Sequence, residues 1–436
     1  MLNITILFIL GIMEWFYQTT ILWTGLASCL LAVFALLRTL SYRNFIAIFQ
    51  IRLQTFFELL TFILLFLFLM LKAVKVPGDW DDTSFHLPLA RFYIENHGIV
   101  LNQYLRFPLF PQNIDLLLAL GLMLGHEVMA QGLATLPLFI SCIGLMGATV
   151  WILNSTFAGY LAIAMLLMLR PSRNIIGYAY IDHGLALFCW GAILALAMWN
   201  QSDRQSRKWI VMAGLLAGGA AGSKYFGAVL ATLLGLYLLV VCKAWRAALT
   251  YAITGTLFGI SWYLRSLLIS GDPIHPAGGA FFGHFLWDAQ DLIGQTQEQA
   301  TFGVGTNLFY VIPAMIKAHV SPWICALFAC CFLKKETSSL RFLYVIFLSY
   351  FLFWFYVTQV PRYLAPLFAV GCFLTVYTLY QGVRKWSIGT RLSTGTWLQN
   401  SYMPSVICLK LLKQLKTGIM HWNAIPDTRC FNRLIN

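Results

Sequence analysis

Charged residues are scarce in this chain of 436 residues: Asp, Glu, Lys and Arg together make up 10% of it, and only 16 residues are acidic. Soluble domains carry about 25% charged residues. A chain that is also 60% hydrophobic, with a mean hydropathy of +0.75, is excluded from that class. The composition predicts an integral membrane protein, and the 34 Phe and 15 Trp suit lipid-facing surfaces and interfacial belts.

A basic stripe with interleaved aromatic residues is also absent from the sequence. The net charge of +13 comes instead from Lys and Arg in short clusters between apolar runs, as the positive-inside rule describes. We therefore expect the membrane as a partner, and no nucleic acid.

The motif C-x-x-C is missing as well, although the chain has ten cysteines. Because eight lie in apolar runs and two in the C-terminal tail, neither a disulfide framework nor a zinc site is expected. The N-terminus is apolar from Leu2 to Ile12 but has no basic stretch before that run and no clear cleavage site. This pattern favours a retained span over a signal peptide.

Apolar runs of membrane-spanning length recur along the chain, and a spanning helix needs about 20 residues. The candidate spans are 2–17, 19–37, 55–73, 131–153, 157–170, 183–199, 209–223, 224–242, 246–268, 321–333, 340–357 and 363–381. They predict an all-α, polytopic membrane protein.

Basic clusters between the spans predict the orientation. Lys and Arg gather at 38–52, 204–208, 243–246, 334–335 and 384–385. If these five connections are cytoplasmic, the loops 74–130, 170–182, 269–320 and 358–362 face the other side of the membrane. Two of them, 74–130 and 269–320, are large outer loops that we expect to carry short surface helices.

One apolar segment in the first outer loop, Asn113–Leu124, is too short to span. Its roughly 12 residues would extend about 18 Å as a helix, whereas the hydrocarbon core is about 30 Å thick. Counting it as a span would also put the basic 204–208 connection outside. We therefore expect a re-entrant or surface helix here, after an amphipathic helix near 83–97.

Asp81 and Asp82 come shortly after an apolar run, where carboxylates are costly unless they face water, a cavity or a partner. Adjacent residues on a helix point about 100° apart, so these two do not form a catalytic dyad with each other. One could face a substrate while the other caps the following helix. His86 is one turn from Asp82 and shares its face; a structural and a catalytic role both stay open for it.

Arg362 lies between Pro361 and Tyr363 at the outer mouth of a span. It is either an anchor that reaches the interface or a fork for phosphate oxygens. Lys224, in AAGSKYFG, has no acidic neighbour in sequence. Further basic residues on the same side are Arg106, Arg170, Arg173 and Arg265. Because they run against the positive-inside rule, they indicate an anionic ligand such as a lipid phosphate.

Asp182, in YAYIDHGLAL, opens a span on the same side. Acidic residues are favourable at helix N-termini, so we interpret Asp182 as a helix cap.

Several stretches resemble one family. GDWDDTSFHLPLARFYIENHG is similar to the first outer loop of GT-C glycosyltransferases, the polyprenyl-phosphate-dependent superfamily that includes protein O-mannosyltransferases and aminoarabinose transferases. Within it the pattern W-D-x-x-x-Y-H-L-P fits, with Phe85 in place of Tyr. YAYIDHGLALFCWGAILAL, AGLLAGGAAGSKYFGAV and WYLRSLLISGDPIHP follow in order, and QVPRYLAP resembles the R-Y-L-L-P that opens a late span. The match covers roughly residues 55–381.

The resemblance implies a GT-C-like fold of about 11–13 transmembrane helices with a catalytic loop on the periplasmic or lumenal side. It also implies a lipid-phosphate-sugar donor and no nucleotide sugar. Asp81 aligns with the catalytic aspartate of the family, Asp82 with the second acid of an Asp-Glu pair, and Arg362 with the arginine linked to the donor phosphate. Further donor or substrate contacts are expected from Tyr363, Lys224, Arg265, His86, Arg106 and His275. The implied location is a bacterial inner membrane with the site facing outward, or alternatively the ER membrane with a lumenal site.

The domain organisation follows from this match. Residues 1–54 add spans and a basic connection, 55–381 form the GT-C-like catalytic domain, and 382–436 form a basic tail. The tail contains no sizeable soluble domain, which leaves the acceptor open among a glycan, a lipid and a protein.

The implied function is an inverting transfer of a sugar from a polyprenyl phosphate to an acceptor hydroxyl. The alternative is a polysaccharide polymerase or ligase, or a lipid-linked-sugar transporter, none of which needs an acid pair directly after a span. A non-enzymatic scaffold would leave the outer basic residues unexplained. No cofactor is certain, and a divalent metal stays open because Asp82, His86 and His275 could meet in space.

Overall fold

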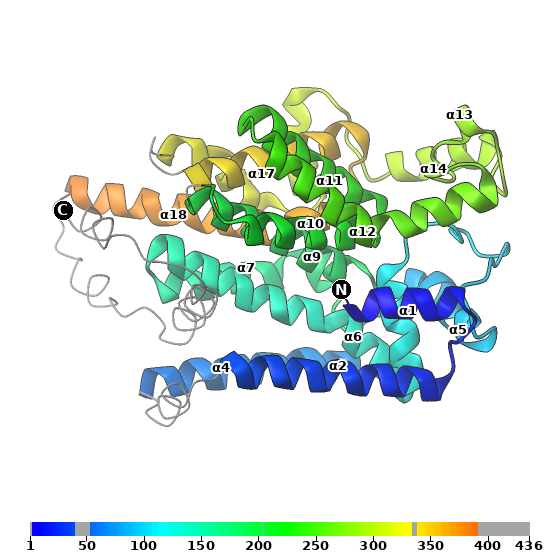
Figure 1. Ribbon diagram of the computed structural model, residues 1–436. Coiled ribbons are helices and arrows are strands. Elements are labelled where there is room, and N and C mark those ends of the chain that lie inside the picture. Colours follow the sequence, from blue (N-terminus) through cyan, green and yellow to red (C-terminus); the bar gives the residue numbers. More distant parts are fainter. Residues whose placement is uncertain (1, 40–52, 203, 334–337, 391–436) are drawn as a thin grey trace.

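The computed structural model describes residues 2–39, 53–202, 204–333 and 338–390 (Figure 1). These ranges contain helices and no strand, which confirms the all-α class. The elements up to the second large loop are α1 Leu2–Ile12, α2 Gln18–Thr39, α4 Leu53–Ala73, the π-helical turn η1 Asp82–His86, α5 Leu87–Glu95, α6 Asn113–Leu153, α7 Thr156–Met168, α8 Arg170–Arg173, α9 Asp182–Gln201, α10 Arg207–Ala221, α11 Tyr225–Leu236, η2 Tyr237–Val241 and α12 Trp245–Ser270.

The remaining elements are α13 Gly279–Phe282, α14 Ala289–Ala300, η3 Leu308–Tyr310, α15 Val311–Lys317, η4 Ser321–Trp323, α16 Ile324–Leu327, η5 Phe328–Phe332, α17 Ser338–Val357, the 3-10 helix η6 Pro361–Leu367 and α18 Phe368–Thr390. Helical structure lies within each run predicted to span, although several of these helices are shorter than the predicted run.

By length and hydropathy, six helical stretches of the described chain could cross a membrane: 55–73, 113–153, 182–201, 245–270, 338–357 and 361–385. Four shorter apolar stretches, at 156–168, 225–241, 308–317 and 321–332, accompany them. Helix α1 has 11 residues, about 16 Å, and is shorter than the span predicted at 2–17. The polytopic membrane architecture is therefore confirmed.

The long helices run roughly side by side, and α5, α13 and α14 lie together at one end of the bundle (Figure 1, right). Helix α18 ends at the opposite side. Most side chains of α9 and α18 are buried, whereas α4 and α12 expose most of theirs. Helices α9 and α18 thus form the interior of the bundle, and α4 and α12 belong to its apolar surface.

Small residues let α10 and α12 approach closely. A Cβ atom added at Gly218 would lie 2.1 Å from the carbonyl oxygen of Gly255, so no side chain fits there. Close backbone approach through small residues is the usual way in which membrane helices associate. This contact fixes the end of α10, from which the Gly222–Lys224 turn begins.

The helix predicted at Asn113–Leu124 is the first part of α6, set apart by non-helical backbone at Gly125 and His126. It is buried rather than on the surface, because the side chains of Ile114, Leu116 and Leu118 are at most 1% exposed. After the turn the chain folds back on it. A Cβ atom at Gly121 would lie 2.5 Å from the Cα atom of Ala130.

We predict that Gly121→Ala destabilises the protein, because the added methyl group meets backbone that can move only by separating the two parts of α6. Overpacking of this kind costs about 1–3 kcal/mol. The measurement is the midpoint of thermal unfolding in detergent. Gly132→Ala is the matched control, since its Cβ would meet only a Met70 sulfur at 3.9 Å. Equal midpoints for the two variants would contradict this packing.

Candidate functional site

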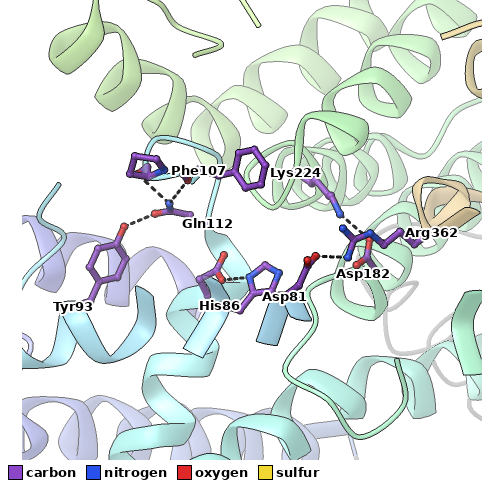
Figure 2. Close-up of polar contacts among 10 residues, drawn as sticks. Asp81, His86, Tyr93, Phe107, Gln112, Asp182, Lys224 and Arg362 are labelled. Atoms are coloured by element: carbon purple, nitrogen blue, oxygen red, sulfur yellow. Dashed lines mark hydrogen bonds and ion pairs between the residues drawn. The ribbon is translucent and has the colours of Figure 1, made fainter. Parts of the chain in front are cut away.

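Four charged side chains from four segments meet at the end of the bundle that carries α5 (Figure 2). They are Asp81 at the start of η1, Asp182 at the start of α9, Lys224 between α10 and α11, and Arg362 in η6. Arg362 donates a hydrogen bond to Asp81, and the Nζ atom of Lys224 donates to Oδ1 of Asp182 over 2.9 Å. These two ion pairs form the centre of the candidate site.

Each basic residue is held by a fixed turn. Trp354 donates to the carbonyl of Val360 (2.8 Å) and Tyr350 to that of Tyr363 (3.0 Å), which together fix the turn that carries Arg362.

The turn that carries Lys224 is held by a contact to the first outer loop. The backbone N–H of Asn113 donates to the carbonyl of Gly222 (2.8 Å). A Cβ atom at Gly222 would lie 2.2 Å from the amide of Asn113, so only glycine permits this approach.

The two pairs differ in depth. The side chains of Asp182 and Lys224 are 1% and 13% exposed, whereas those of Asp81 and Arg362 are 25% and 30% exposed. The outer pair is therefore open to a ligand, and the inner pair lies beneath it. The Oδ2 atom of Asp182 is buried and has no hydrogen-bond partner among the described residues. A buried carboxylate oxygen without a donor needs a further partner, such as a ligand hydroxyl or water.

Aromatic rings border the basic groups. The ring of Tyr363 stacks on Phe226 with centroids 4.1 Å apart, and the Nζ atom of Lys224 lies 5.0 Å from the Tyr363 centroid. The guanidinium carbon of Arg362 lies 5.6 Å from the ring of Tyr180. Burial, together with the charge of Asp81, raises the pKa of Tyr180, so this phenol stays protonated. Rings in these positions limit the directions in which the basic groups can point.

The adjacent acids Asp81 and Asp82 have different surroundings. Asp82 is fully buried, and neither carboxylate oxygen has a hydrogen-bond partner within the described part of the chain. Burial raises the pKa of Asp82, and the nearby carboxylate of Asp79 adds to this effect. The predicted capping role is wrong for both acids, because neither side chain makes a capping hydrogen bond.

His86 pairs with a residue that the sequence pattern missed. Its Nδ1 atom lies 2.7 Å from Oδ1 of Asp115, and the two residues are 4% and 1% exposed. His86 makes no hydrogen bond with Asp82, the residue expected to share its helix face. Asp115 is a lone acid in the apolar segment NIDLLLALG. An acid in such a run marks a functional or paired position, and that signal could have identified it.

Asp182 is also not a helix cap, because its Oδ1 atom accepts from Lys224 and its Oδ2 atom has no partner in the described ranges. Its partner is Lys224, which lies 42 residues further along the chain, between α10 and α11.

Other predicted site residues make contacts outside the two ion pairs. Arg265 is buried and donates to the carbonyls of Pro108 (3.1 Å) and Val100 (3.4 Å) in the first outer loop. Arg106 is exposed and joins that loop to Glu298 and Gln295 of the second. These two arginines therefore hold the outer loops in place, and a contact with substrate stays a prediction for both.

His275 lies in the buried turn after α12, and its carbonyl accepts from Tyr225 over 2.7 Å. Burial lowers the pKa of His275, and Asp272 opposes this shift. Within residues 2–39, 53–202, 204–333 and 338–390, no three His, Cys, Asp or Glu residues are grouped to hold a metal ion. Asp82, His86 and His275 thus do not form the grouping that the sequence left open.

Comparison with known structures identifies the fold. The chain is similar to the crystal structure of ArnT from Cupriavidus metallidurans bound to undecaprenyl phosphate, with a TM-score of 0.54 and 18% sequence identity. The match covers 81% of this chain and 63% of the ArnT chain. The protein is therefore a polytopic membrane protein whose fold is similar to that of this structure. No family model matches the sequence.

Two curated relatives come from Shigella flexneri. The chain is 43% identical over 188 residues to "Uncharacterized protein SF2093/S2215", across 43% of this chain and 92% of that protein. It is 41% identical over 123 residues to "Uncharacterized protein SF2092/S2214", across 28% of this chain and 67% of that protein. The chain belongs to the family of these proteins.

We predict that Lys224→Met destabilises the protein by up to about 3–5 kcal/mol, because the buried carboxylate of Asp182 loses its main counter-ion. Thermal unfolding in detergent measures the change. The matched control is Lys224→Met combined with Asp182→Asn, which removes both charges and should recover much of the loss. An equal loss in the single and double variants would show that the pair is not what stabilises this region.

Proposed function

We propose that the protein transfers a sugar from a polyprenyl-phosphate donor to an acceptor hydroxyl, with inversion at the anomeric carbon. The observation that carries this proposal is the partly exposed ion pair between Arg362 and Asp81, set above the buried pair of Lys224 and Asp182. An acid able to accept a proton and a guanidinium able to bind phosphate lie in direct contact. The ArnT-like fold supports the same class of reaction.

The pair has a direct use in this chemistry. A donor phosphate that binds Arg362 would compete with the carboxylate of Asp81, since a guanidinium fork fits either oxyanion. Donor binding would then release Asp81 from its ion pair and leave it free to accept a proton. Lys224 lies one layer below and would add a second positive charge. The acid therefore becomes available only when the donor is present.

The reaction itself would be a single displacement. The acceptor oxygen attacks the anomeric carbon, the bond from that carbon to the phosphate oxygen breaks, and Asp81 takes the proton of the attacking hydroxyl. Arg362 and Lys224 stabilise the negative charge that develops on the departing phosphate. Tyr363, stacked on Phe226, would keep both cations directed at that group. These assignments need residues of this chain alone, and a divalent metal is not used in any step.

The side of the membrane follows from charge. We place the site on the periplasmic or lumenal face, because the basic end of α18, with Arg384 and Lys385, lies at the opposite side of the bundle and favours the cytoplasm (Figure 1). The acceptor can be a glycan, a lipid or a protein. A polymerase, ligase or transporter of lipid-linked sugars is the competing function, and it would not need a carboxylate that binds the same guanidinium as the donor phosphate.

Asp81→Asn keeps the size of the side chain and removes the proton acceptor, so we expect turnover to fall by about 10²-fold or more. The measurement is release of undecaprenyl phosphate from a panel of undecaprenyl-phosphate hexoses and pentoses. Binding of undecaprenyl phosphate itself should stay equal or become tighter, because Asp81 no longer competes for Arg362. Glu95→Gln, an exposed acid on α5, is the control. Normal turnover in Asp81→Asn would reject this base.

Two substitutions of Arg362, to Lys and to Ala, distinguish a guanidinium that binds the donor phosphate from one that only anchors the chain at the membrane interface. Lysine cannot reproduce a two-point contact with phosphate, so we expect Arg362→Lys to weaken binding of undecaprenyl phosphate by about tenfold or more, and Arg362→Ala to nearly abolish turnover. Arg207→Lys, an exposed arginine at the start of α10 in a connection assigned to the opposite side, is the matched control. Unchanged affinity in Arg362→Lys would instead favour an interfacial anchor, for which lysine serves equally well.

A further inference from the structure

The backbone between Asp81 and His86 is unusual. Residues Asp82–His86 form a π-helical turn, in which the N–H of Leu87 bonds to the carbonyl of Asp82, five residues earlier. A single π-helical turn of this kind is rare in proteins and occurs frequently at functional sites. Asp81 immediately precedes the turn, and His86 is its last residue.

Other contacts place His86 at the same centre. Its ring lies 6.1 Å from that of Tyr180, which in turn lies 5.6 Å from the guanidinium carbon of Arg362. Figure 2 shows the ring of His86 beside Asp81, with its hydrogen bond directed to the other side. His86 thus lies between the charged site and the buried acid of α6.

Asp115 determines which nitrogen of His86 is free. An ionised carboxylate can only accept, so the Nδ1 atom, 2.7 Å away, must carry the hydrogen. The Nε2 atom of the neutral ring is then left with its lone pair. A carboxylate in this position also stabilises the imidazolium that forms when Nε2 takes up a proton. An oriented histidine of this kind is a proton acceptor, and the reaction described above does not use it.

We propose that His86, oriented by Asp115, receives the proton that Asp81 removes from the acceptor hydroxyl. This inference rests on the proposed function. The O–H bond of the acceptor breaks as its oxygen bonds to the anomeric carbon, the phosphate leaves with the electron pair of the broken bond, and the proton goes to Asp81. The proton then passes to Nε2 of His86 and from the imidazolium to water. Asp81 is thereby ionised again and can reform its ion pair with Arg362 when the product phosphate leaves.

His86 and Asp115 are positioning residues in this scheme, because neither touches the donor. The charged and titratable groups around His86 are Asp81 on its own segment, Asp115 from α6, Tyr180, Asp182 of α9 and Arg362 of η6. Of these, Asp115 contacts the ring directly, and Asp81 lies beside the ring on its other side (Figure 2).

The first test needs no catalysis. Nitrogen-15 NMR of histidine-labelled protein in detergent reports the tautomer of His86 and the pH at which Nε2 is protonated. We expect the Nδ1–H tautomer in the wild-type protein and a lower protonation midpoint in Asp81→Asn, since a neighbouring negative charge has been removed. Glu95→Gln should leave the midpoint unchanged. An Nε2–H tautomer, or a midpoint that ignores Asp81→Asn, would overturn the relay even if the protein transfers no sugar.

The second test uses turnover. We expect His86→Asn to lower turnover by about tenfold or more and to remove the acidic limb of the pH profile, while binding of undecaprenyl phosphate stays normal. The double variant His86→Asn/Asp115→Asn, which leaves no buried carboxylate without a partner, should be no slower than the single one. His97→Asn is the control, since His97 is exposed. An unchanged pH profile in a variant that folds and binds the lipid would mean that the dyad is structural, whereas absent turnover in the wild-type protein would refute the proposed function.

Discussion

The ion pair between Arg362 and Asp81 joins segments that are 281 residues apart in the sequence. One partner opens the first helical turn after α4, and the other lies in the 3-10 helix that precedes α18. The start and the end of the membrane bundle must therefore both be in place before the site exists. The second pair, Lys224 with Asp182, is more deeply buried, where a charge is costly unless it is compensated, and the two pairs together balance the four charges.

Backbone contacts away from the four charged groups fix the segments that carry them. The contact between Gly218 and Gly255 fixes the end of α10, and the contact between Asn113 and Gly222 fixes the turn that follows. Arg265 adds hydrogen bonds to two carbonyls of the first outer loop. Arg265 and small residues of the membrane helices thus contribute to the site through the backbone, and a substrate contact of Arg265 stays a prediction. The position of Lys224 depends on the contacts of Gly218 and Gly222.

Much of the architecture could be predicted because apolar length is a local property. Helices lie at each predicted span, and the short segment 113–124 is separate from the span that follows, as its length required. Asp81 and Arg362 could also be selected individually, from their positions at the mouths of spans and from the family resemblance.

What local patterns could not predict was pairing. The partner of Asp182 lies 42 residues away and that of His86 lies 29 residues away, on other helices. An interpretation from the neighbouring residues of the same helix therefore assigned capping roles to Asp81 and Asp182, which pair with residues of other segments. The π-helical turn was missed for a similar reason, since residues 82–86 suit an α-helix equally well and tertiary contacts decide the difference.

The contrast between the two adjacent acids explains how one turn can carry a single reactive carboxylate. Asp82 is buried, and burial raises its pKa, which favours the neutral acid. Asp81 is partly exposed and has the guanidinium of Arg362 as its partner. The ion pairs of Asp81 with Arg362 and of Asp182 with Lys224 hold two negative and two positive groups. Under the proposed function, a raised pKa at Asp82 favours binding of an anionic donor, because it lowers the negative charge beside the two cations. The burial of Asp82 and the partial exposure of Asp81 thus leave one carboxylate of this turn accessible to a ligand.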